Sequence, residues 1–175
     1  MKSMKETWSL NNGVQIPCLG FGTYKAAEGS TSEIIKTAIR CGYRYLDTAS
    51  FYETETYVGE AVAESGIRRE EFFLVSKVWK DEMGYDGTLR AFERTLENLG
   101  TDYLDLYLIH QPMGDYIGAY RAMEGGLQGR KTESHRCVQL LSGPPGGSVR
   151  DSGRDAGCEP GRAASFLPAG RRPGS

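Results

Sequence analysis

Residues 43–66, YRYLDTASFYETETYVGEAVAESG, contain the pattern that decides the fold. Four of the first six residues are aromatic, apolar or β-branched, and Arg44 and Asp47 stand among them, which is typical of a strand. Residues 54–65 then repeat apolar side chains at helical spacing, and Gly66 supplies the residue type that most often ends a helix. A strand followed directly by an amphipathic helix is the repeating unit of a parallel sheet.

The same unit recurs about every thirty residues up to residue 124. Further strands are predicted at 18–22, 72–78 and 103–110, and further helices between 30 and 42, between 86 and 100, and from about 114 onward. Ser30 and Glu33 have the spacing of a capping box at the start of the first helix. Ahead of these units, the Asn12-Gly13 pair between two short alternating runs predicts a β-hairpin.

Alternating strands and helices leave two architectures open, a (β/α)8 barrel and a doubly wound parallel sheet. A doubly wound sheet that binds a dinucleotide carries G-x-G-x-x-G after its first strand. Residues 20–25, GFGTYK, supply two of these glycines and a lysine in place of the third. The missing glycine argues against a dinucleotide-binding sheet and leaves the barrel as the favoured fold class.

In both architectures, functional side chains gather at the carboxyl ends of the strands. Each polar or aromatic residue expected at that edge has an ordinary explanation when taken alone: a turn cap, a solvated charge, packing, or an edge hydrogen bond. Taken together, they suggest a catalytic site. The residues are Thr23, Tyr24, Asp47, Tyr52, Lys77, Trp79 and His110.

The chemistry that the set suggests is reduction of a carbonyl. Lys77 lies inside the apolar run FFLVSKVW at 72–79 and needs a counter-ion, for which Asp47 on the neighbouring strand is the candidate. An ammonium near Tyr52 would stabilise the phenolate, lower the pKa of the phenol and make it a usable general acid. His110 would then orient a carbonyl oxygen that accepts the proton as a hydride arrives at carbon.

Three segments carry a resemblance to a known family. Residues 42–62 (GYRYLDTASFYETETYVGEAV), 72–79 (FFLVSKVW) and 102–112 (DYLDLYLIHQP) resemble, in order, the signature regions of the aldo-keto reductases. The resemblance runs from about Trp8 to Glu124 and lies nearest the bacterial branch similar to 2,5-diketo-D-gluconate reductases. It implies a (β/α)8 barrel that reduces aldehydes and ketones with NADPH and without a metal.

The resemblance also implies roles for individual residues. Tyr52 would be the general acid, and Lys77, paired with Asp47, would lower its pKa. The residues expected to contact the cofactor are Gly22, Thr23, Tyr24 and Asp47. Those expected to contact the substrate are Tyr24, Trp79 and His110.

Residues 125–175 have a different composition from residues 1–124. They hold 8 basic and 4 acidic residues, 11 of the 23 Gly and 5 of the 7 Pro, and few apolar side chains. So little apolar surface predicts disorder. Degenerate codons for 125–169, translated one nucleotide later, are compatible with family-like segments such as EAYKAGK, GVSNFYPDRLVDLC and AVNQVELHPFYQQ. We therefore expect a frameshift after Glu124, with 1–124 the N-terminal half of the barrel and activity of this chain impaired.

Composition excludes other classes. The net charge is −2, no apolar run is long enough to span a membrane, and the four cysteines lack metal-ligand spacing. We expect a cytoplasmic protein whose partner is a small carbonyl compound, with neither nucleic acid nor membrane involved. The intact enzyme is expected to be a monomer, and this chain to self-associate through the open edges of its first and fourth strands. The alternatives are a binding module with a basic tail and a non-enzymatic half-barrel that dimerises.

Overall fold

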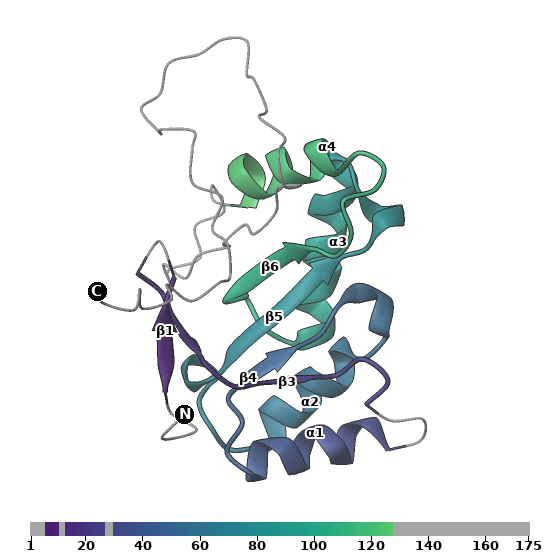
Figure 1. Ribbon diagram of the computed structural model, residues 1–175. Coiled ribbons are helices and arrows are strands. Elements are labelled where there is room, and N and C mark those ends of the chain that lie inside the picture. Colours follow the sequence, from purple (N-terminus) through teal and green to yellow (C-terminus); the bar gives the residue numbers. More distant parts are fainter. Residues whose placement is uncertain (1–5, 11–12, 27–29, 128–175) are drawn as a thin grey trace, which may run out of the picture.

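The computed structural model describes residues 6–10, 13–26 and 30–127, drawn in colour in Figure 1. The chain begins with an antiparallel hairpin of β1 (Thr7–Ser9) and β2 (Gln15–Pro17), in which Trp8 stands opposite Ile16. The predicted hairpin is therefore confirmed. Gly13 adopts φ +84° at its turn, a conformation that glycine reaches without steric cost. Asn12 lies outside the described residues.

A four-stranded parallel sheet follows the hairpin. Its order is β3-β4-β5-β6, so each strand pairs with the next one along the chain. All four predicted strands are confirmed, each shorter than or equal to its predicted range. The strands are β3 (Gly20–Gly22), β4 (Tyr45–Asp47), β5 (Phe73–Val78) and β6 (Leu106–Ile109).

Helices join the strands and cover one side of the sheet (Figure 1). The α-helices are α1 (Thr31–Arg40), α2 (Glu55–Glu64), α3 (Tyr85–Leu99) and α4 (Tyr116–Arg121). Shorter turns are the 3₁₀ segments η1 (Ser50–Tyr52), η2 (Arg69–Glu71) and η3 (Lys80–Glu82), and the π-helical η4 (Ala122–Leu127). No helix of the described ranges is both long and apolar enough to cross a bilayer.

The capping box predicted for α1 does not form. Ser30 is the N-cap residue, as expected, but its side chain makes no capping hydrogen bond. Its backbone dihedrals of φ −147° and ψ 29° lie outside the extended region that N-cap residues usually adopt. The helix is instead positioned by its apolar face, because Ile35, Ala38 and Ile39 are buried.

Two clusters of apolar side chains lie on opposite faces of the sheet. The larger one packs Leu74 and Val78 of β5 against the helices. On the other face, Phe73 and Val75 pack with Ile16 of the hairpin. Alternate side chains of β5 therefore point to opposite faces, as strand geometry requires. The hairpin covers the second face near the amino ends of the strands (Figure 1) and leaves the carboxyl ends for other groups.

Sheet order decides between the two predicted architectures. A doubly wound sheet reverses direction at a switch point, so its first strand lies in the interior of the sheet. Here β3 is at one edge, and the order continues to β6 without reversal. Such single-direction winding is that of a (β/α)8 barrel, and the described residues form its first four units. Of residues 125–175, predicted to be disordered and frameshifted, the structure describes only 125–127, which form the end of η4, and residues 128–175 lie outside the described ranges.

Candidate active site

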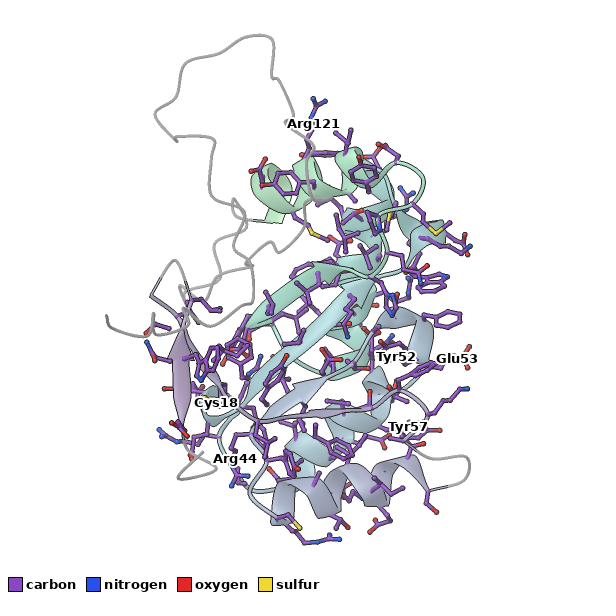
Figure 2. All side chains as sticks on the ribbon, in the orientation of Figure 1. Cys18, Arg44, Tyr52, Glu53, Tyr57 and Arg121 are labelled. Atoms are coloured by element: carbon purple, nitrogen blue, oxygen red, sulfur yellow. The ribbon has the colours of Figure 1, made fainter. Side chains whose placement is uncertain are left out.

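Four of the predicted site residues converge at the carboxyl ends of neighbouring strands. Asp47 is the last residue of β4, Lys77 is the penultimate residue of β5, and His110 directly follows β6. Tyr52 ends the η1 turn that follows β4. Figure 2 shows Tyr52 beyond this end of β4, with Arg44 at the opposite end of the strand.

An ion pair joins two adjacent strands at the centre of this site. Lys77 Nζ lies 2.5 Å from Asp47 Oδ1, and it also donates to the Thr48 carbonyl oxygen at 3.0 Å. The Lys77 side chain is 14% exposed, so a counter-ion and a carbonyl acceptor are needed to offset its loss of water. The structure thus contains the Lys77–Asp47 pair that the sequence predicted.

Tyr52 and His110 form the second pair of the site. Tyr52 Oη lies 3.0 Å from His110 Nε2, and the two rings meet edge to face at 86°. Burial, followed by the Lys77 ammonium, lowers the pKa of His110 below its ordinary value. The imidazole is therefore neutral at pH 7, so Nε2 accepts the tyrosine proton in one tautomer and donates to Tyr52 Oη in the other.

The expected lowering of the Tyr52 pKa is not what the structure shows. Burial raises the pKa of this phenol, and the charge of Asp47 and the neighbouring Tyr24 act in the same direction. The reason is geometric. The Lys77 ammonium lies 5.1 Å from the centre of the Tyr52 ring, while its hydrogen bonds go to Asp47 and Thr48. Tyr52 is thus fully protonated at neutral pH and able to donate.

Aromatic rings border these polar groups. Tyr24 packs against Tyr52 at 4.8 Å between ring centres, and Trp79 meets the edge of His110 at the same separation. Phe51 stacks on Trp79 at 4.0 Å and 14°, and both Tyr24 and Phe51 are about half exposed. Sequence reasoning missed Phe51, because the turn that places it beside Trp79 has no local signature.

Gly22 at the end of β3 and Thr23 after it, both expected to contact the cofactor, differ in their surroundings. Gly22 has open space where a side chain would begin, since a Cβ there would meet no atom within 4 Å. Thr23, in contrast, is fully buried. Its hydroxyl donates to the Asp47 carbonyl oxygen at 3.2 Å and lies 2.8 Å from Thr54 Oγ1. The Thr23 side chain therefore holds neighbouring loops together.

An open depression of about 630 Å³ lies beside Tyr52. It is bordered by Tyr24 and Lys25 after β3, by the start of α1, and by the η1 turn with Tyr57 of α2. In the part of the chain that the structure describes, no group of three or more His, Cys, Asp or Glu side chains is placed to hold a metal ion.

The geometry suits the organic cofactor that the resemblance implies. Gly22 leaves room for a flat ring to approach the backbone, Tyr24 offers an exposed aromatic face, and the Asp47 carboxylate remains 27% exposed. Tyr24 packs against the Tyr52 ring, and Gly22 stands opposite Asp47 in the register of β3 and β4.

Comparison with known proteins gives the lineage. Residues 18–127 match the Aldo/keto reductase family. The chain belongs to this family. It is 50% identical over 124 residues to glyoxal reductase of Bacillus subtilis (strain 168), an alignment that covers 70% of this chain and 45% of that protein. This aldo/keto reductase chain thus spans about half the length of the curated relatives that it matches.

Solved structures confirm the fold of this aldo/keto reductase chain. The crystal structure of an aldo/keto reductase from Brucella melitensis is similar, with a TM-score of 0.69 and 38% identity, covering 77% of this chain and 52% of the other. An aldo-keto reductase from Bombyx mori, in complex with NADP, gives a TM-score of 0.67 at 34% identity, covering 72% of this chain and 48% of the other. The predicted barrel lineage is therefore confirmed for the described part.

Proposed function

We propose that this chain carries the proton-donating half of an NADPH-dependent carbonyl reductase, which converts aldehydes or ketones to alcohols. The observation that supports this most directly is the 3.0 Å contact between Tyr52 Oη and His110 Nε2. The Lys77–Asp47 ion pair lies against the same tyrosine ring. A neutral imidazole and a protonated phenol side by side can both hydrogen-bond one carbonyl oxygen.

The proposed reaction moves one proton within the protein. Tyr52 donates its hydroxyl proton to the carbonyl oxygen, while neutral His110 orients that oxygen by a hydrogen bond from Nε2. NADPH, when bound, supplies the hydride that the carbonyl carbon receives. The phenolate left on Tyr52 would lie near the Lys77 ammonium, which stands 5.1 Å from the centre of the tyrosine ring in the ground state.

The proposed substrate class is a small aldehyde or ketone, in a cytoplasmic setting. The aromatic border formed by Tyr24, Phe51 and Trp79 suits the carbon skeleton of such a compound. Because a 50% identical relative is a glyoxal reductase, glyoxal is the first compound to test. Proposed contacts to the substrate come from Tyr24, Trp79 and His110, and to the cofactor from Gly22, Tyr24 and Asp47, with the fully buried Thr23 supporting Asp47 through its hydrogen bond.

We also propose that residues 125–175 are a frameshifted translation of the second half of the barrel. What supports this is the hidden family-like sequence in the neighbouring frame, together with the change of composition after Glu124. If residues 125–175 are out of frame, they do not supply the later strands that close the barrel around its site. The chain with this tail is thus expected to lack NADPH binding, and a frame-restored gene is expected to encode an active reductase.

The first experiment is to resequence the gene across the Glu124 codon. The second is to express both the 175-residue chain and the frame-restored protein, and to follow the loss of NADPH absorbance with glyoxal and a panel of other aldehydes and ketones. Turnover in the frame-restored protein, abolished by Tyr52→Phe, is the expected result. Turnover that survives Tyr52→Phe contradicts the assignment of the proton donor, and a frame-restored protein without any turnover contradicts the function.

A second candidate is a half-barrel that pairs with another copy and has no activity. The observation in its favour is that β3 and β6 are edge strands within the described sheet. Open strand edges are ready to pair with another chain. Sedimentation over a range of concentrations separates the cases: a discrete dimer supports this candidate, whereas a monomer or polydisperse aggregate contradicts it.

A further inference from the structure

The turn that carries Tyr52 is tied to neighbouring segments on both sides of the tyrosine. Before it, Ser50 Oγ donates to Glu82 Oε2 of η3 at 2.7 Å, and the Lys77 carbonyl oxygen lies 3.3 Å from the same hydroxyl oxygen. After it, Glu55 Oε1 accepts a hydrogen bond from Ser76 Oγ of β5 at 2.7 Å. Tyr52 is therefore held between one contact to η3 and one contact to the residue of β5 that precedes the site lysine.

Glu55 is an unusual residue for the first turn of a surface helix. It is only 3% exposed, and Ser76 is completely buried. Its second carboxylate oxygen, Oε2, accepts from Asn98 Nδ2 of α3 at 2.9 Å. A carboxylate is costly to bury unless its oxygens are hydrogen-bonded, so these two bonds determine where Glu55 can lie. The helix start is thereby fixed against both β5 and α3.

Strand alternation transmits this contact to the active site. Ser76 points to the helix side of the sheet, while Lys77 points to the opposite face, where it meets Asp47 and the ring of Tyr52. A shift of α2 relative to Ser76 therefore also shifts the Tyr52 ring relative to Lys77. Glu55 itself contacts neither the Tyr52 hydroxyl nor Lys77 Nζ.

Little chain lies between Glu55 and Tyr52 to absorb such a change. Glu53 is held at φ +56°, in the left-handed region that non-glycine residues rarely adopt. Thr54 is buried, and its hydroxyl lies 2.8 Å from Thr23 Oγ1 and 2.9 Å from Thr48 Oγ1. The connection is thus rigid, and the position of Glu55 is passed on to the tyrosine.

We propose that Glu55 is a positioning residue of the reductase site, whose buried bond to Ser76 holds Tyr52 in place against Lys77 and His110. The role of Glu55 in catalysis rests on the proposed function, but its effect on the position of Tyr52 can be measured without turnover. An acidic residue in the first turn of a helix also stabilises the helix dipole. That ordinary role needs neither burial nor Ser76, so the two roles can be separated.

The test is an NMR titration of the His110 imidazole in the 175-residue chain. The chain has only two histidines, His110 and His135, so the signals are readily assigned. Glu55→Ala and Ser76→Ala are compared with two controls on the same helix. Glu60→Ala removes an exposed acid, and Val62→Ala removes buried methyl groups away from the turn.

Both test variants are expected to raise the pKa of His110 toward its ordinary value. When the turn is released, Tyr52 withdraws from Nε2 and water reaches the imidazole, so burial lowers its pKa less. Lys77 and Asp47, the charged groups that also act on His110, remain unchanged in these variants. Neither control is expected to move the titration, although Val62→Ala destabilises the fold. Glu55→Gln keeps the length, retains one oxygen that can accept from Asn98 Nδ2, and can donate from its amide to Ser76 Oγ, so it is expected to restore wild-type behaviour.

An unchanged His110 titration in Glu55→Ala and Ser76→Ala overturns the proposal, even if both variants lose stability. Should Glu55→Ala fail to fold, Ser76→Ala decides alone, because it removes a single oxygen atom. In the frame-restored protein, Glu55→Ala should lower kcat on the order of tenfold or more with little change in KM. If that protein shows no turnover at all, the proposed function fails while the titration still decides the positioning.

Discussion

Replacing Asp105 by alanine tests whether one buried ion pair holds the amino ends of the strands together. Asp105 is 5% exposed and directly precedes β6. Its Oδ2 accepts from the Leu74 backbone N–H at 2.9 Å and from the Arg69 guanidinium at 2.9 Å. The guanidinium also lies 4.0 Å from the centre of the Tyr103 ring. Asp105→Ala therefore removes the counter-ion of a largely buried arginine.

The magnitude follows from which groups are left without a partner. Removing one member of a buried ion pair costs about 3–5 kcal/mol, because the remaining charge is uncompensated. Arg69 keeps three neutral acceptors, the Thr101 hydroxyl and the Phe72 and Tyr103 carbonyl oxygens. These bonds place the expected loss near the lower limit, at about 3 kcal/mol. That is a large share of the roughly 5–15 kcal/mol by which domains are stable.

The assay is urea unfolding followed by far-ultraviolet circular dichroism, with Asp102→Ala as the matched control, since Asp102 is exposed three residues earlier. The control is expected to stay within about 0.5 kcal/mol of the wild type. Arg69→Met in the Asp105→Ala background should recover part of the loss, because the unpaired charge is gone. An Asp105→Ala variant as stable as the control would refute the reasoning.

Three further predictions concern the site and the packing of the helices. Lys77→Met should raise the pKa of His110, because the Lys77 ammonium is one cause of its lowering; an NMR titration identical to that of the wild type would contradict this. Since the folded-state pKa of His110 lies below its unfolded value, protonation favours the unfolded chain. Stability contributed by neutral His110 should thus be lost as pH falls below about 6.5, a loss measured by urea unfolding at several pH values. Gly59→Ala should lower the free energy of unfolding by about 1–3 kcal/mol in the same assay, because a Cβ there would lie 2.5 Å from the Leu99 carbonyl oxygen. The control is Gly22→Ala, where a Cβ meets open space, and it should change the free energy of unfolding by less than about 0.5 kcal/mol.

The order and type of the main elements could be predicted because their signals are local. The helix predicted to open at Asp86 begins at Tyr85, and it ends at Gly100, whose φ of +61° is the left-handed cap that glycine favours. Strand ends were less predictable. The first strand was expected from Cys18 but begins at Gly20, because a strand is defined by the partner with which it pairs.

Several site features had no local signal. Glu55 drew no interpretation from the sequence, because only the packing of α2 onto β5 and α3 buries it beside Ser76 and Asn98. The capping box at Ser30 failed for the opposite reason, since a local pattern was present but the backbone entered the helix at an unsuited angle. Phe51 likewise became part of the site only through its stacking on Trp79.

The sequence by itself determined the alternation of strands and helices, the lineage, and the placement of Asp47, Lys77 and His110 at the carboxyl ends of their strands. These properties follow from periodicity along a single element. Only the tertiary structure decided that Tyr52 meets His110 across 58 residues and that its pKa is raised. The physical reason is that a pKa depends on burial and on the distance to each charge. Both depend on how the η1 turn packs against β5 and β6, which the periodicity of a single segment does not determine.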